Sequence, residues 1–555
     1  MTAASSNIAA RLSEQAALRP WQRAIVAPSG RDASGRRQYV QLTFAQLEDE
    51  SNRIAQGLLD RGLKPEQKLV LFVPFGIEFI TLTFALFKAG ATIVLIDPGM
   101  GRTNIFRCLE EVQPDGFVAI PKVHLARWWY RKRFPQARLN VSVGKKSPLA
   151  MTTHDELRKT PLDAFQPVPR TARDPAAVIF TSGSTGPPKG VLYEHGMFAA
   201  QVDLIRDHYG IEPGEVDLPA FPLFGLFNGA LGVTTVIPDM DTTRPAQVNP
   251  KLIIEAIEDQ GVTVSFGSPA FWNRVGRYCE QHGVTFPSIR RAMSAGGPVP
   301  THVLRRMSKI LTRDGADLFT PYGATESLPV ASIGGREILE QTADRTRNGA
   351  GTCVGQVFAG VDVQIIEMTS GPLTSIDQAR ILPTGEIGEI IVRSAAVTRE
   401  YYLRKEATLA AKIPDGDSFW HRIGDVGYLD DDGKLWFCGR KAHIVETPQG
   451  RMYSVCCEAI LEEHPQIYRA ALVGLGVAPQ QRPVLIAEPE EGMFPTTPEA
   501  EQALRDELLR MAAKHPLTEQ VTDVLLHRAF PVDTRHNVKI NREALASWAE
   551  SELVR

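Results

Sequence analysis

The sequence lacks the features that mark several broad classes of protein. Only six of its 555 residues are cysteines, none stands in a Cys-x-x-Cys pair, and two are adjacent, Cys456 and Cys457. This scarcity excludes a disulfide framework of the small-secreted-domain kind and gives no support to a zinc site. Charge is balanced too, because 61 Lys and Arg residues stand against 64 Asp and Glu residues, a net charge of −3. That balance argues against a general electrostatic attraction to nucleic acid.

No segment has the pattern of a signal peptide or of a membrane span. Residues 1–11 are rich in Ala and Ser and contain no sustained apolar run, so we expect a cytoplasmic protein. Residues 69–96 form an apolar stretch long enough for a bilayer, but Pro74, Glu78 and Lys88 interrupt it. The two ends of the stretch differ in character, which favours a strand, a helix and a second strand over a single span.

That stretch begins a repeated alternation of strands and helices. Residues 69–73 and 91–96 have the continuous apolar character of buried strands, and residues 78–89 have that of a helix. A strand, a helix and a strand within about thirty residues form the βαβ unit of a parallel sheet. Further strands are predicted at residues 116–120, 176–180, 262–266 and 291–295, and a helix at residues 250–260. The alternation predicts an α/β fold with parallel-sheet αβα subdomains.

The character of the sequence changes beyond residue 350. Residues 361–367, 388–393 and 434–438 have the pattern of strands bounded by Gly, Pro and Asp turns, which is typical of a β-rich, antiparallel subdomain. The remaining chain is long enough for a small α+β domain of its own. We therefore predict a large N-terminal domain over residues 1–438 and a small, mobile C-terminal domain over residues 439–555.

The strongest chemical signal is a glycine- and hydroxyl-rich loop that directly follows the strand predicted at residues 176–180. The loop consists of Thr181, Ser182, Gly183, Ser184, Thr185 and Gly186, and Lys189 follows after two prolines. Such a loop turns successive backbone N–H groups inward to cradle a polyphosphate, and a lysine adds a point charge. A flexible linker has a similar composition, but linkers seldom follow a buried strand. The prolines after Gly186 distinguish the loop from a Walker A sequence.

This loop resembles the phosphate loop of the adenylate-forming superfamily, which contains acyl-CoA synthetases, luciferases and the adenylation domains of peptide synthetases. Further segments are similar to motifs of that superfamily and occur in the same order along the chain. They are Ala295–Pro298 (Ala-Gly-Gly-Pro), Tyr322–Glu326 (Tyr-Gly-Ala-Thr-Glu), His421–Asp425 (His-Arg-Ile-Gly-Asp), Gly439-Arg440 at the interdomain hinge and Lys539–Arg542 (Lys-Ile-Asn-Arg). The ordered set identifies the chain as a member of the superfamily. It implies that the C-terminal domain is a lid that carries the catalytic lysine.

The resemblance implies ATP and Mg²⁺ as cofactors and a role for each matched residue. The β- and γ-phosphates would be held by Thr181, Ser182, Ser184, Thr185 and Lys189, on a backbone shaped by Gly183 and Gly186. Adenine would be contacted by Gly296, Gly297 and Tyr322, with Gly323 behind the tyrosine. Asp425 would bind the ribose hydroxyls, with Arg440 nearby. The catalytic residues would be Thr325 and Lys539 at the α-phosphate and Glu326 as the Mg²⁺ ligand. These residue types suit carboxylate adenylation, because charge that develops at the α-phosphorus must be neutralised.

Each residue taken singly also has a plainer interpretation. Tyr322 would fit as an ordinary core aromatic, Glu326 as a charge at a helix N-terminus, and Asp425 as a turn residue. Their joint occurrence in the superfamily's order favours the functional interpretation.

Several positions depart from the pattern of coenzyme A ligases. Pro448 and Gln449 stand where those enzymes have the glycines that let pantetheine approach, and Gly225 stands where they commonly have a histidine. Ile423 replaces a threonine, and Ala442 replaces the usual Asp or Lys of the hinge. Val538 replaces the glycine before Lys539, and the loop that contains it is two residues longer than usual. These changes are explained either by drift within an acyl-CoA synthetase or by loss of the thioester half-reaction.

The same departures resemble one branch of the superfamily, the β-lactone synthetases of bacterial long-chain olefin biosynthesis. The segments that carry this resemblance are Asp97–Arg102, Pro222–Asn228 and Arg535–Ile540. The branch implies a long-chain 2-alkyl-3-hydroxy acid as substrate, activated as its acyl-adenylate and closed to a β-lactone by its own 3-hydroxyl. The sequence does not identify the base for that hydroxyl. His195 and Glu194 are candidates, but a surface position or a supporting role behind the site is favoured for both. The alternatives are a long-chain fatty acyl-CoA synthetase and a non-enzymatic nucleotide-binding scaffold.

One further segment, Arg127–Phe134, combines four aromatic residues with four cations. An amphipathic segment with its aromatic side chains in the core is the favoured interpretation, and peripheral contact with a membrane or a neighbouring enzyme is the alternative. The resemblance implies a reductase and a β-lactone decarboxylase as neighbours in the pathway. No nucleic-acid partner is expected.

We expect Lys539→Ala to reduce pyrophosphate release by about a hundredfold or more, the size of effect seen when a group that stabilises transition-state charge is removed. The reason is that no other cation of the Arg535–Lys539 loop matches the position of the superfamily's catalytic lysine. Release at a near-normal rate would show that the site has been assigned wrongly.

Overall fold

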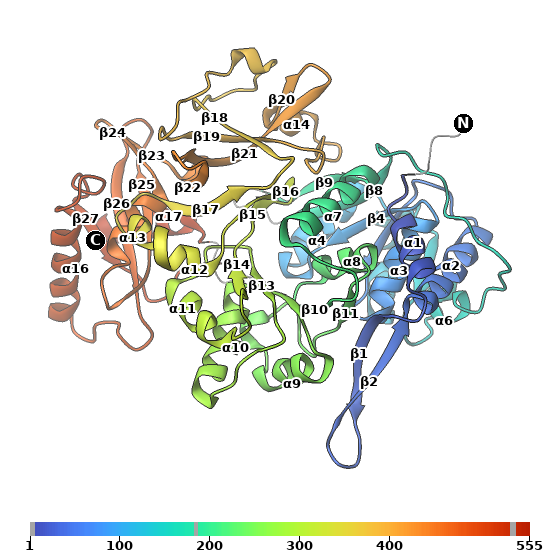
Figure 1. The fold of residues 1–555 in the computed structure, drawn as a ribbon. Helices are drawn as coiled ribbons and strands as arrows, with labels where there is room; N and C mark the ends of the chain where they lie inside the picture. Colours follow the sequence, from blue (N-terminus) through green and yellow to red (C-terminus); the bar gives the residue numbers. More distant parts are fainter. Residues whose placement is uncertain (1–5, 182–186, 533–539, 555) are drawn as a thin grey trace.

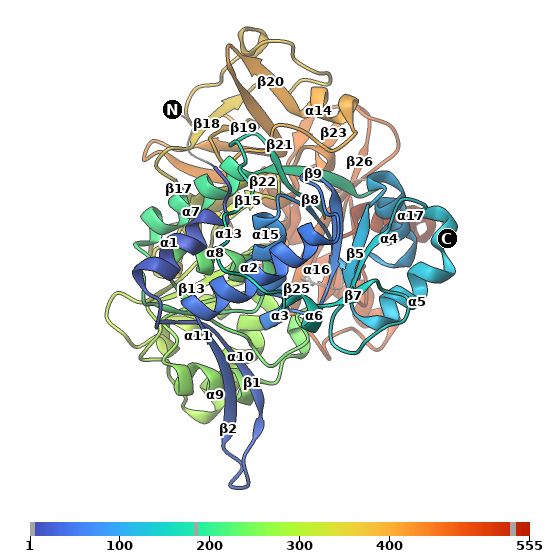
Figure 2. The ribbon, with the colours of Figure 1, turned by 90° about the vertical axis from the view of Figure 1, so that its right-hand side faces the viewer.

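Three β-sheets and a small C-terminal α+β domain make up the protein. The computed structural model describes residues 6–181, 187–532 and 540–554. In Figure 1 the first sheet lies at the right, the second at the bottom, the third at the top and the C-terminal elements at the left. Figure 2 shows the molecule from the side of the first sheet.

The first sheet contains the βαβ unit predicted at residues 69–96. Strands β3 (Lys68–Phe72) and β4 (Thr92–Ile96) pair in parallel, and α3 (Ile77–Lys88) connects them. The strand order is β7-β6-β5-β3-β4-β8-β9, and only β9 is antiparallel to its neighbour. The other strands are β5 (Gly116–Ala119), β6 (Leu139–Ser142), β7 (Thr152–Thr153), β8 (Pro175–Thr181) and β9 (Lys189–Glu194). The parallel strands therefore end at one common edge.

The second sheet has the order β14-β13-β12-β10-β11-β1-β2 and is parallel except at β2. Its strands are β1 (Arg23–Arg31), β2 (Arg37–Thr43), β10 (Val216–Pro219), β11 (Thr234–Val236), β12 (Val264–Gly267), β13 (Arg291–Ser294) and β14 (Asp317–Phe319). The β1–β2 hairpin projects from the body (Figure 1). The two parallel-rich sheets confirm the α/β prediction.

The third sheet is antiparallel throughout. Its strands are β15 (Tyr322–Ala324), β16 (Ser327–Ser332), β17 (Thr352–Val357), β18 (Asp362–Ile366), β19 (Gly388–Arg393), β20 (Lys412–Asp415), β21 (Ser418–Leu429) and β22 (Lys434–Arg440). This sheet confirms the change of character predicted beyond residue 350.

The C-terminal elements pack around cores of their own. A hairpin of β23 (Val445–Thr447) and β24 (Gly450–Met452) precedes a sheet of β25 (Ile467–Leu475), β26 (Arg482–Pro489) and β27 (Asp523–Leu526), with helices α15 (Ser454–Leu461), α16 (Pro498–Ala512) and α17 (Arg542–Val554). Two apolar clusters in this part contain only residues from 445 onward. A small α+β domain is thus confirmed, whereas the boundary between residues 438 and 439, which lies within β22, stays a prediction.

The remaining helices cover the sheets. They are α1 (Ala10–Leu18), α2 (Phe44–Asp60), α4 (Arg102–Val112), α5 (Pro121–Trp129), α6 (His154–Leu157), α7 (His195–Tyr209), α8 (Pro222–Leu231), α9 (Pro250–Gln260), α10 (Pro269–His282), α11 (Thr301–Ile310), α12 (Gly335–Glu337), α13 (Ala343–Arg347) and α14 (Lys405–Ala411). Short 3-10 or π turns are η1 (Pro98–Met100), η2 (Arg131–Arg133), η3 (Pro245–Gln247), η4 (Ile338–Thr342), η5 (Ile376–Gln378) and η6 (Lys441–His443).

Local sequence explains where these helices begin and end. The side chain of Asn249 caps α9, Pro250 occupies its first turn, and Gly261 ends it at a φ of +63°. These bounds match the helix predicted at residues 250–260.

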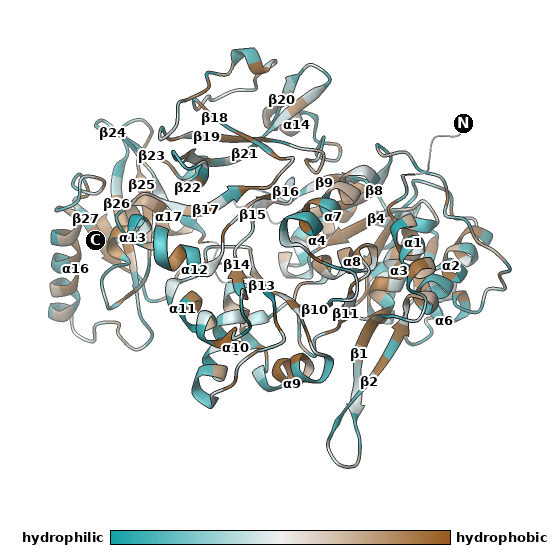
Figure 3. Cartoon of the chain, viewed as in Figure 1, coloured by the Kyte–Doolittle hydropathy of each residue, from teal (hydrophilic) through white to brown (hydrophobic). Residues whose placement is uncertain are grey.

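The largest apolar core lies where the three sheets meet. It joins Leu71 of the first sheet, Phe266 of the second and Leu435 of the third through α3, α7 and α8. Figure 3 shows hydrophobic residues concentrated on strands such as β4 and β19. Lys88 at the end of α3 is buried and donates to the Glu48 carboxylate at 2.6 Å and to the Ser51 hydroxyl at 2.8 Å, which pairs its charge. Among the described residues, no helix is long and apolar enough to cross a membrane.

Candidate active site

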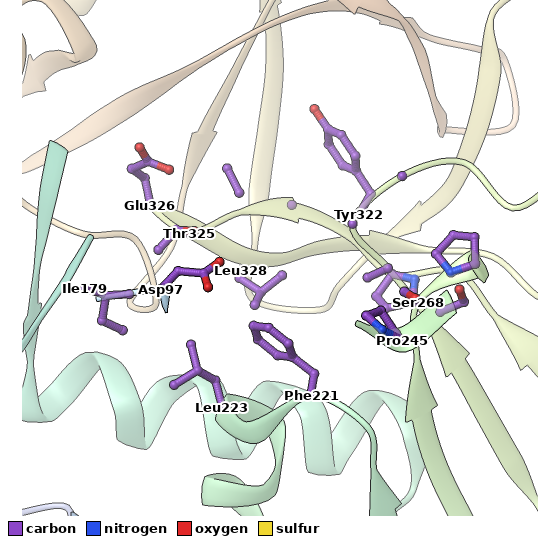
Figure 4. Close-up of a pocket in the computed structure, with 18 of the residues that line it drawn as sticks. Asp97, Ile179, Phe221, Leu223, Pro245, Ser268, Tyr322, Thr325, Glu326 and Leu328 are labelled. Carbon is purple, nitrogen blue, oxygen red and sulfur yellow. The ribbon is translucent and has the colours of Figure 1, made fainter. Parts of the chain in front are cut away.

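A single cavity of about 2680 Å³ lies at the carboxyl edges of the first two sheets, beside the third sheet. Figure 4 shows its central part. The predicted site residues that line it are Lys189, Gly296, Gly297, Tyr322, Gly323, Thr325, Glu326, Asp425 and Arg440. The fold therefore gathers residues from widely separated segments around one space.

Tyr322, Asp425 and Arg440 form one cluster, joined by a hydrogen bond and an ion pair. The Tyr322 hydroxyl donates to Oδ2 of Asp425 at 2.6 Å, and Nε of Arg440 lies 3.0 Å from Oδ1. Asp425 is buried and faces Arg440 across the β21–β22 pair. Burial, and then the Asp425 charge, raise the pKa of Tyr322 well above its usual value, so the phenol stays protonated and donates. The cluster presents an aromatic ring beside a paired carboxylate.

Thr325 and Glu326 occupy the tight turn between β15 and β16. The hydroxyl of Tyr193 donates to the Thr325 carbonyl at 2.5 Å, and that of Tyr401 donates to Oε1 of Glu326 at 2.8 Å. Nζ of Lys189 lies 5.1 Å from the centre of the Tyr401 ring. Two buried tyrosines thus orient the turn.

A buried lysine lies behind this turn. The Thr398 N–H donates to the Glu326 carbonyl at 2.9 Å, and Nζ of Lys412 donates to the Thr398 carbonyl. Burial lowers the pKa of Lys412 to about 7, although the Glu326 charge opposes that shift. Glu326 is therefore backed by a second layer of polar contacts.

Two of the predicted glycines lie where a side chain is disfavoured. Gly296 follows β13 with a φ of +97°, in the region that favours glycine. A Cβ atom on Gly323 would lie 2.6 Å from the Ser327 carbonyl oxygen. Glycine at these positions brings the backbone itself to the wall of the cavity.

Several predicted residues lie outside the described residues. They are Ser182, Gly183, Ser184, Thr185, Gly186 and Lys539, and the side chain of Thr181 is likewise not described. The two ends of the Lys539 segment are described: Val532 and Ile540 form an isolated antiparallel bridge. Ile540 and Arg542 line the cavity, and Arg542 pairs with Glu458 at 2.6 Å.

The inner part of the cavity is apolar. Phe221 and Leu223 point into it from the start of α8, and Leu328 faces them from β16 (Figure 4). A Cβ atom on Gly225 would lie 2.9 Å from Cζ of Phe75 and 3.1 Å from Cγ of Pro219. A side chain at position 225 would therefore require Phe75 to shift.

His195 and Glu194, the residues considered as a base, do not line the cavity. Nδ1 of His195 accepts the Ile8 N–H at 3.2 Å, and burial lowers the pKa of this histidine to about 4. Glu194 lies 3.6 Å from Arg399. Neither residue therefore contacts the space in which a substrate would lie.

Sequence reasoning missed two residues at the site. Tyr401 is 75 positions from the Glu326 carboxylate it contacts, and no motif marked it. Asp97, at the end of β4, points into the cavity (Figure 4). Its position after a buried parallel strand was the available signal, because ligands bind where such strands end. Ile96 is the register partner of Phe180, so Asp97 lies next to Thr181 at the sheet edge.

The sequence is similar to those of known enzymes along nearly its whole length. A model of the family described as AMP-binding enzyme matches residues 12–402. An olefin β-lactone synthetase of Xanthomonas campestris pv. campestris is 45% identical over 99% of this chain and 98% of its own length. One from Stenotrophomonas maltophilia is 46% identical with the same coverage. The chain belongs to the olefin β-lactone synthetase family of AMP-binding enzymes.

A solved structure supports the fold independently. The amide bond synthetase McbA from Marinactinospora thermotolerans superposes with a TM-score of 0.77 at 23% identity, over 98% of this chain and 99% of that one. Membership of the family confirms the predicted superfamily, the AMP-forming ligase and its use of ATP. It disfavours a scaffold that only binds nucleotide.

The site is compatible with Mg²⁺. In the parts of the chain that the structure describes, no group of three or more His, Cys, Asp or Glu side chains could hold a metal ion alone. Magnesium beside a nucleotide needs only one or two carboxylates, because phosphates and water supply its other ligands. The Glu326 carboxylate lines the cavity and fits that requirement.

We expect Asp425→Asn to raise the KM for ATP by about 10- to 100-fold, because a charge-assisted hydrogen bond is worth about 1.5–3 kcal/mol. The change leaves Arg440 without its ion pair and weakens the acceptor for the ribose. The measurement is the ATP dependence of pyrophosphate release. Asp217→Asn is the matched control, because Asp217 is buried and bonded to Asn228 at 2.8 Å outside the cavity. Equal KM values for both variants would contradict the assignment.

Proposed function

We propose that this protein is an ATP-dependent, AMP-forming β-lactone synthetase of olefin biosynthesis whose substrate is a long-chain 2-alkyl-3-hydroxy acid. The observation that carries the proposal is the identity of 45–46% to two olefin β-lactone synthetases over nearly the full length of each chain. The cavity supports it, because a polar nucleotide region and an apolar acyl region share one space.

In this proposal the polar region binds ATP. Tyr322 stacks on adenine beside Gly296 and Gly297, and Asp425, held by Arg440, accepts from the ribose hydroxyls. The phosphate loop, from Thr181 to Gly186 with Lys189, holds the β- and γ-phosphates. Support comes from the Tyr322–Asp425–Arg440 cluster and from Lys189, which lines the same cavity and lies 5.1 Å from the centre of the Tyr401 ring.

Adenylation follows at the turn between β15 and β16. A carboxylate oxygen of the acid attacks the α-phosphorus, and the bond from that phosphorus to the bridging oxygen breaks to release pyrophosphate. Thr325 and Lys539 stabilise the charge that develops on the α-phosphate. Mg²⁺, held by Glu326, would neutralise phosphate charge when bound. The hydrogen bond from Tyr401 fixes the Glu326 carboxylate for that purpose.

Ring closure then uses a nucleophile within the substrate. The 3-hydroxyl oxygen bonds to the acyl carbon, the bond from that carbon to the AMP oxygen breaks, and the hydroxyl proton leaves to a base or to solvent. AMP departs, and the product is the acid less one water. An intramolecular nucleophile held against the carbonyl supplies the effective concentration that a second substrate would otherwise provide.

Two structural features support the lactone over a thioester. Pro448 and Gln449 form the turn of the β23–β24 hairpin, where the Gln449 N–H donates to the Thr447 hydroxyl at 3.2 Å. A turn with two side chains allows less close approach than two glycines would. The Cβ atom of a histidine at position 225 would lie 2.9 Å from Cζ of Phe75, so that ring would have to shift. The runner-up function is a long-chain acyl-CoA synthetase. None of the contacts among the described residues specifically favours it.

The segment Arg127–Phe134 supports a docking role in part. Tyr130 and Phe134 pack on Phe106, with ring centroids 4.6 and 6.4 Å apart, as a core-packed segment would. Trp128 and Trp129 instead remain 42% and 72% exposed. We propose that these tryptophans, with the cations of η2, contact an anionic membrane surface or the pathway reductase and decarboxylase.

The product is the first test of this proposal. The purified enzyme with Mg-ATP and a 2-alkyl-3-hydroxy acid should yield a neutral product lighter than the acid by one water, identified by NMR and mass spectrometry. Added coenzyme A should neither accelerate AMP formation nor enter the product. The matched acid without a 3-hydroxyl should be adenylated and then stall as bound acyl-adenylate. An acyl-CoA thioester formed as fast as AMP would overturn the lactone and favour the runner-up.

The docking role has a separate test. Trp129→Ser combined with Lys132→Glu should reduce sedimentation with anionic vesicles and co-purification with the pathway enzymes, because it removes an apolar anchor and reverses a charge. These two residues are chosen because Arg131 and Arg133 already interact with Trp128 and Glu110. Trp21→Ser is the control, since Trp21 is 83% exposed in a different part of the molecule. Unchanged binding by the double variant would identify the segment as an ordinary solvated surface.

A further inference from the structure

The cavity continues along both faces of the first sheet. Successive residues of a strand point to opposite faces. Leu71 and Ile179 belong to the core shared by the three sheets, whereas their neighbours Phe72 and Phe180 belong to or pack on the cluster beneath α4. All four line the cavity. It therefore passes around the carboxyl edge of the sheet and has two limbs.

The inner limb lies between the first and second sheets. Its walls are Leu71, Phe79 and Ile179 on one side and Leu223, Phe224 and Phe266 on the other. The rings of Phe224 and Phe266 are stacked at 3.8 Å. This limb is enclosed by the main core and has no charged side chain among those walls.

The outer limb lies between the opposite face of the first sheet and the helices α4 and α5, which Figure 2 shows beside β5. Ile105, Phe106 and Leu109 line it from α4, and Val123, Ala126 and Tyr130 line it from α5 and its C-terminal end. Cations stand at its rim: the Arg102 guanidinium lies 5.5 Å from the centre of the Tyr130 ring. The limb is thus apolar inside and charged at the surface.

The two limbs join at the end of β4. Asp97 and Pro98 line the cavity there, and Asp97 points into it on the side of Thr325 and Leu328 in Figure 4. Thr325 and Glu326 line the same cavity, and in the proposed function the carboxylate is activated at their turn. A substrate whose carboxyl group lies at this point has an apolar channel on either side.

We infer that the two limbs bind the two alkyl chains of one substrate molecule separately, one chain in the inner limb and the other in the outer limb. The inference rests on the proposed function and adds to it the position that each alkyl chain of the acid would take. A straight-chain acid would leave one apolar limb filled with water. Each buried methylene contributes about 0.8 kcal/mol, so an acid that fills both limbs is strongly preferred.

The geometry of the acid agrees with this arrangement. Its chains start from adjacent carbons, C2 and C3, beside the carboxyl group. Two chains that diverge from one point need two channels that diverge from one point. The cavity divides in this way at the edge of the first sheet, where Leu71 lines one limb and Phe72 lines the other. Separating the chains also fixes the position of the 3-hydroxyl relative to the acyl carbon, which is what ring closure requires.

Matched blocking variants test the inference. Val123→Trp narrows the outer limb and Leu223→Trp narrows the inner limb, while Val477→Trp, at a position 81% exposed and outside the cavity, is the control. Each variant is assayed by pyrophosphate release with two acids, one with a long 2-alkyl and a short 3-alkyl chain and the other with the reverse. This assay reports adenylation, so it gives a chain-length profile even if the product is not a lactone.

Each blocking variant should lose kcat/KM on a different one of the two acids, by about tenfold for every two methylene groups displaced. Both variants losing the same acid, or Val123→Trp behaving like Val477→Trp, would overturn the inference. If the variants show the expected chain-length dependence of kcat/KM but no lactone is formed, only the proposed function is contradicted.

A second measurement does not depend on the folding of any variant. The unmodified enzyme is photo-crosslinked with acids that carry a diazirine at the end of one chain or of the other, and the labelled peptides are mapped by mass spectrometry. One probe should label α4 or α5 and the other α8 or β12. Labelling of α8 and β12 by both probes would show that both chains share the inner limb.

Discussion

The ion pair between the buried Asp425 carboxylate and the partly exposed Arg440 is the interaction on which the polar half of the site depends. It fixes β21 to the last residue of β22, and the Tyr322 hydroxyl joins the same carboxylate from β15. A carboxylate that is buried needs such partners, because an unpaired charge out of water is costly. Beyond Arg440 the chain passes into the C-terminal elements. The pair therefore anchors the nucleotide region at the point where the predicted lid begins.

A second constraint is that the proposed long-chain, apolar acid and the highly charged ATP must bind in one cavity. The fold meets it by placing the ends of two parallel sheets side by side. Their faces supply apolar walls, and their carboxyl edges, with the loops that follow β4, β8 and β13, supply polar groups. Apolar walls exclude water around the reacting carbonyl, and fewer waters there mean stronger electrostatic stabilisation and less hydrolysis of an acyl-adenylate.

The departures from the coenzyme A ligase pattern have physical explanations here. Gly225 allows α8 to approach Phe75 closely, since a Cβ atom at this position would lie 2.9 Å from Cζ of Phe75. Pro448 and Gln449 complete a regular hairpin whose register pairs Thr447 with Gly450. These features are consistent with an enzyme whose second nucleophile belongs to the substrate itself.

The sequence by itself determined the fold class, and it predicted residues such as Lys189, Tyr322 and Asp425, which line one cavity in the structure. Short apolar strands alternating with helices specify parallel sheets, and glycine- and hydroxyl-rich turns at strand ends mark where a ligand binds, because both signals are local. Only the tertiary structure decided that Tyr401 donates to Glu326, that His195 is buried away from the cavity, and that Asp97 points into it. It also decided that the apolar cavity has two limbs. These results depend on contacts between residues far apart in the chain, and on which face of a sheet each side chain meets, and neither is encoded in any single local pattern.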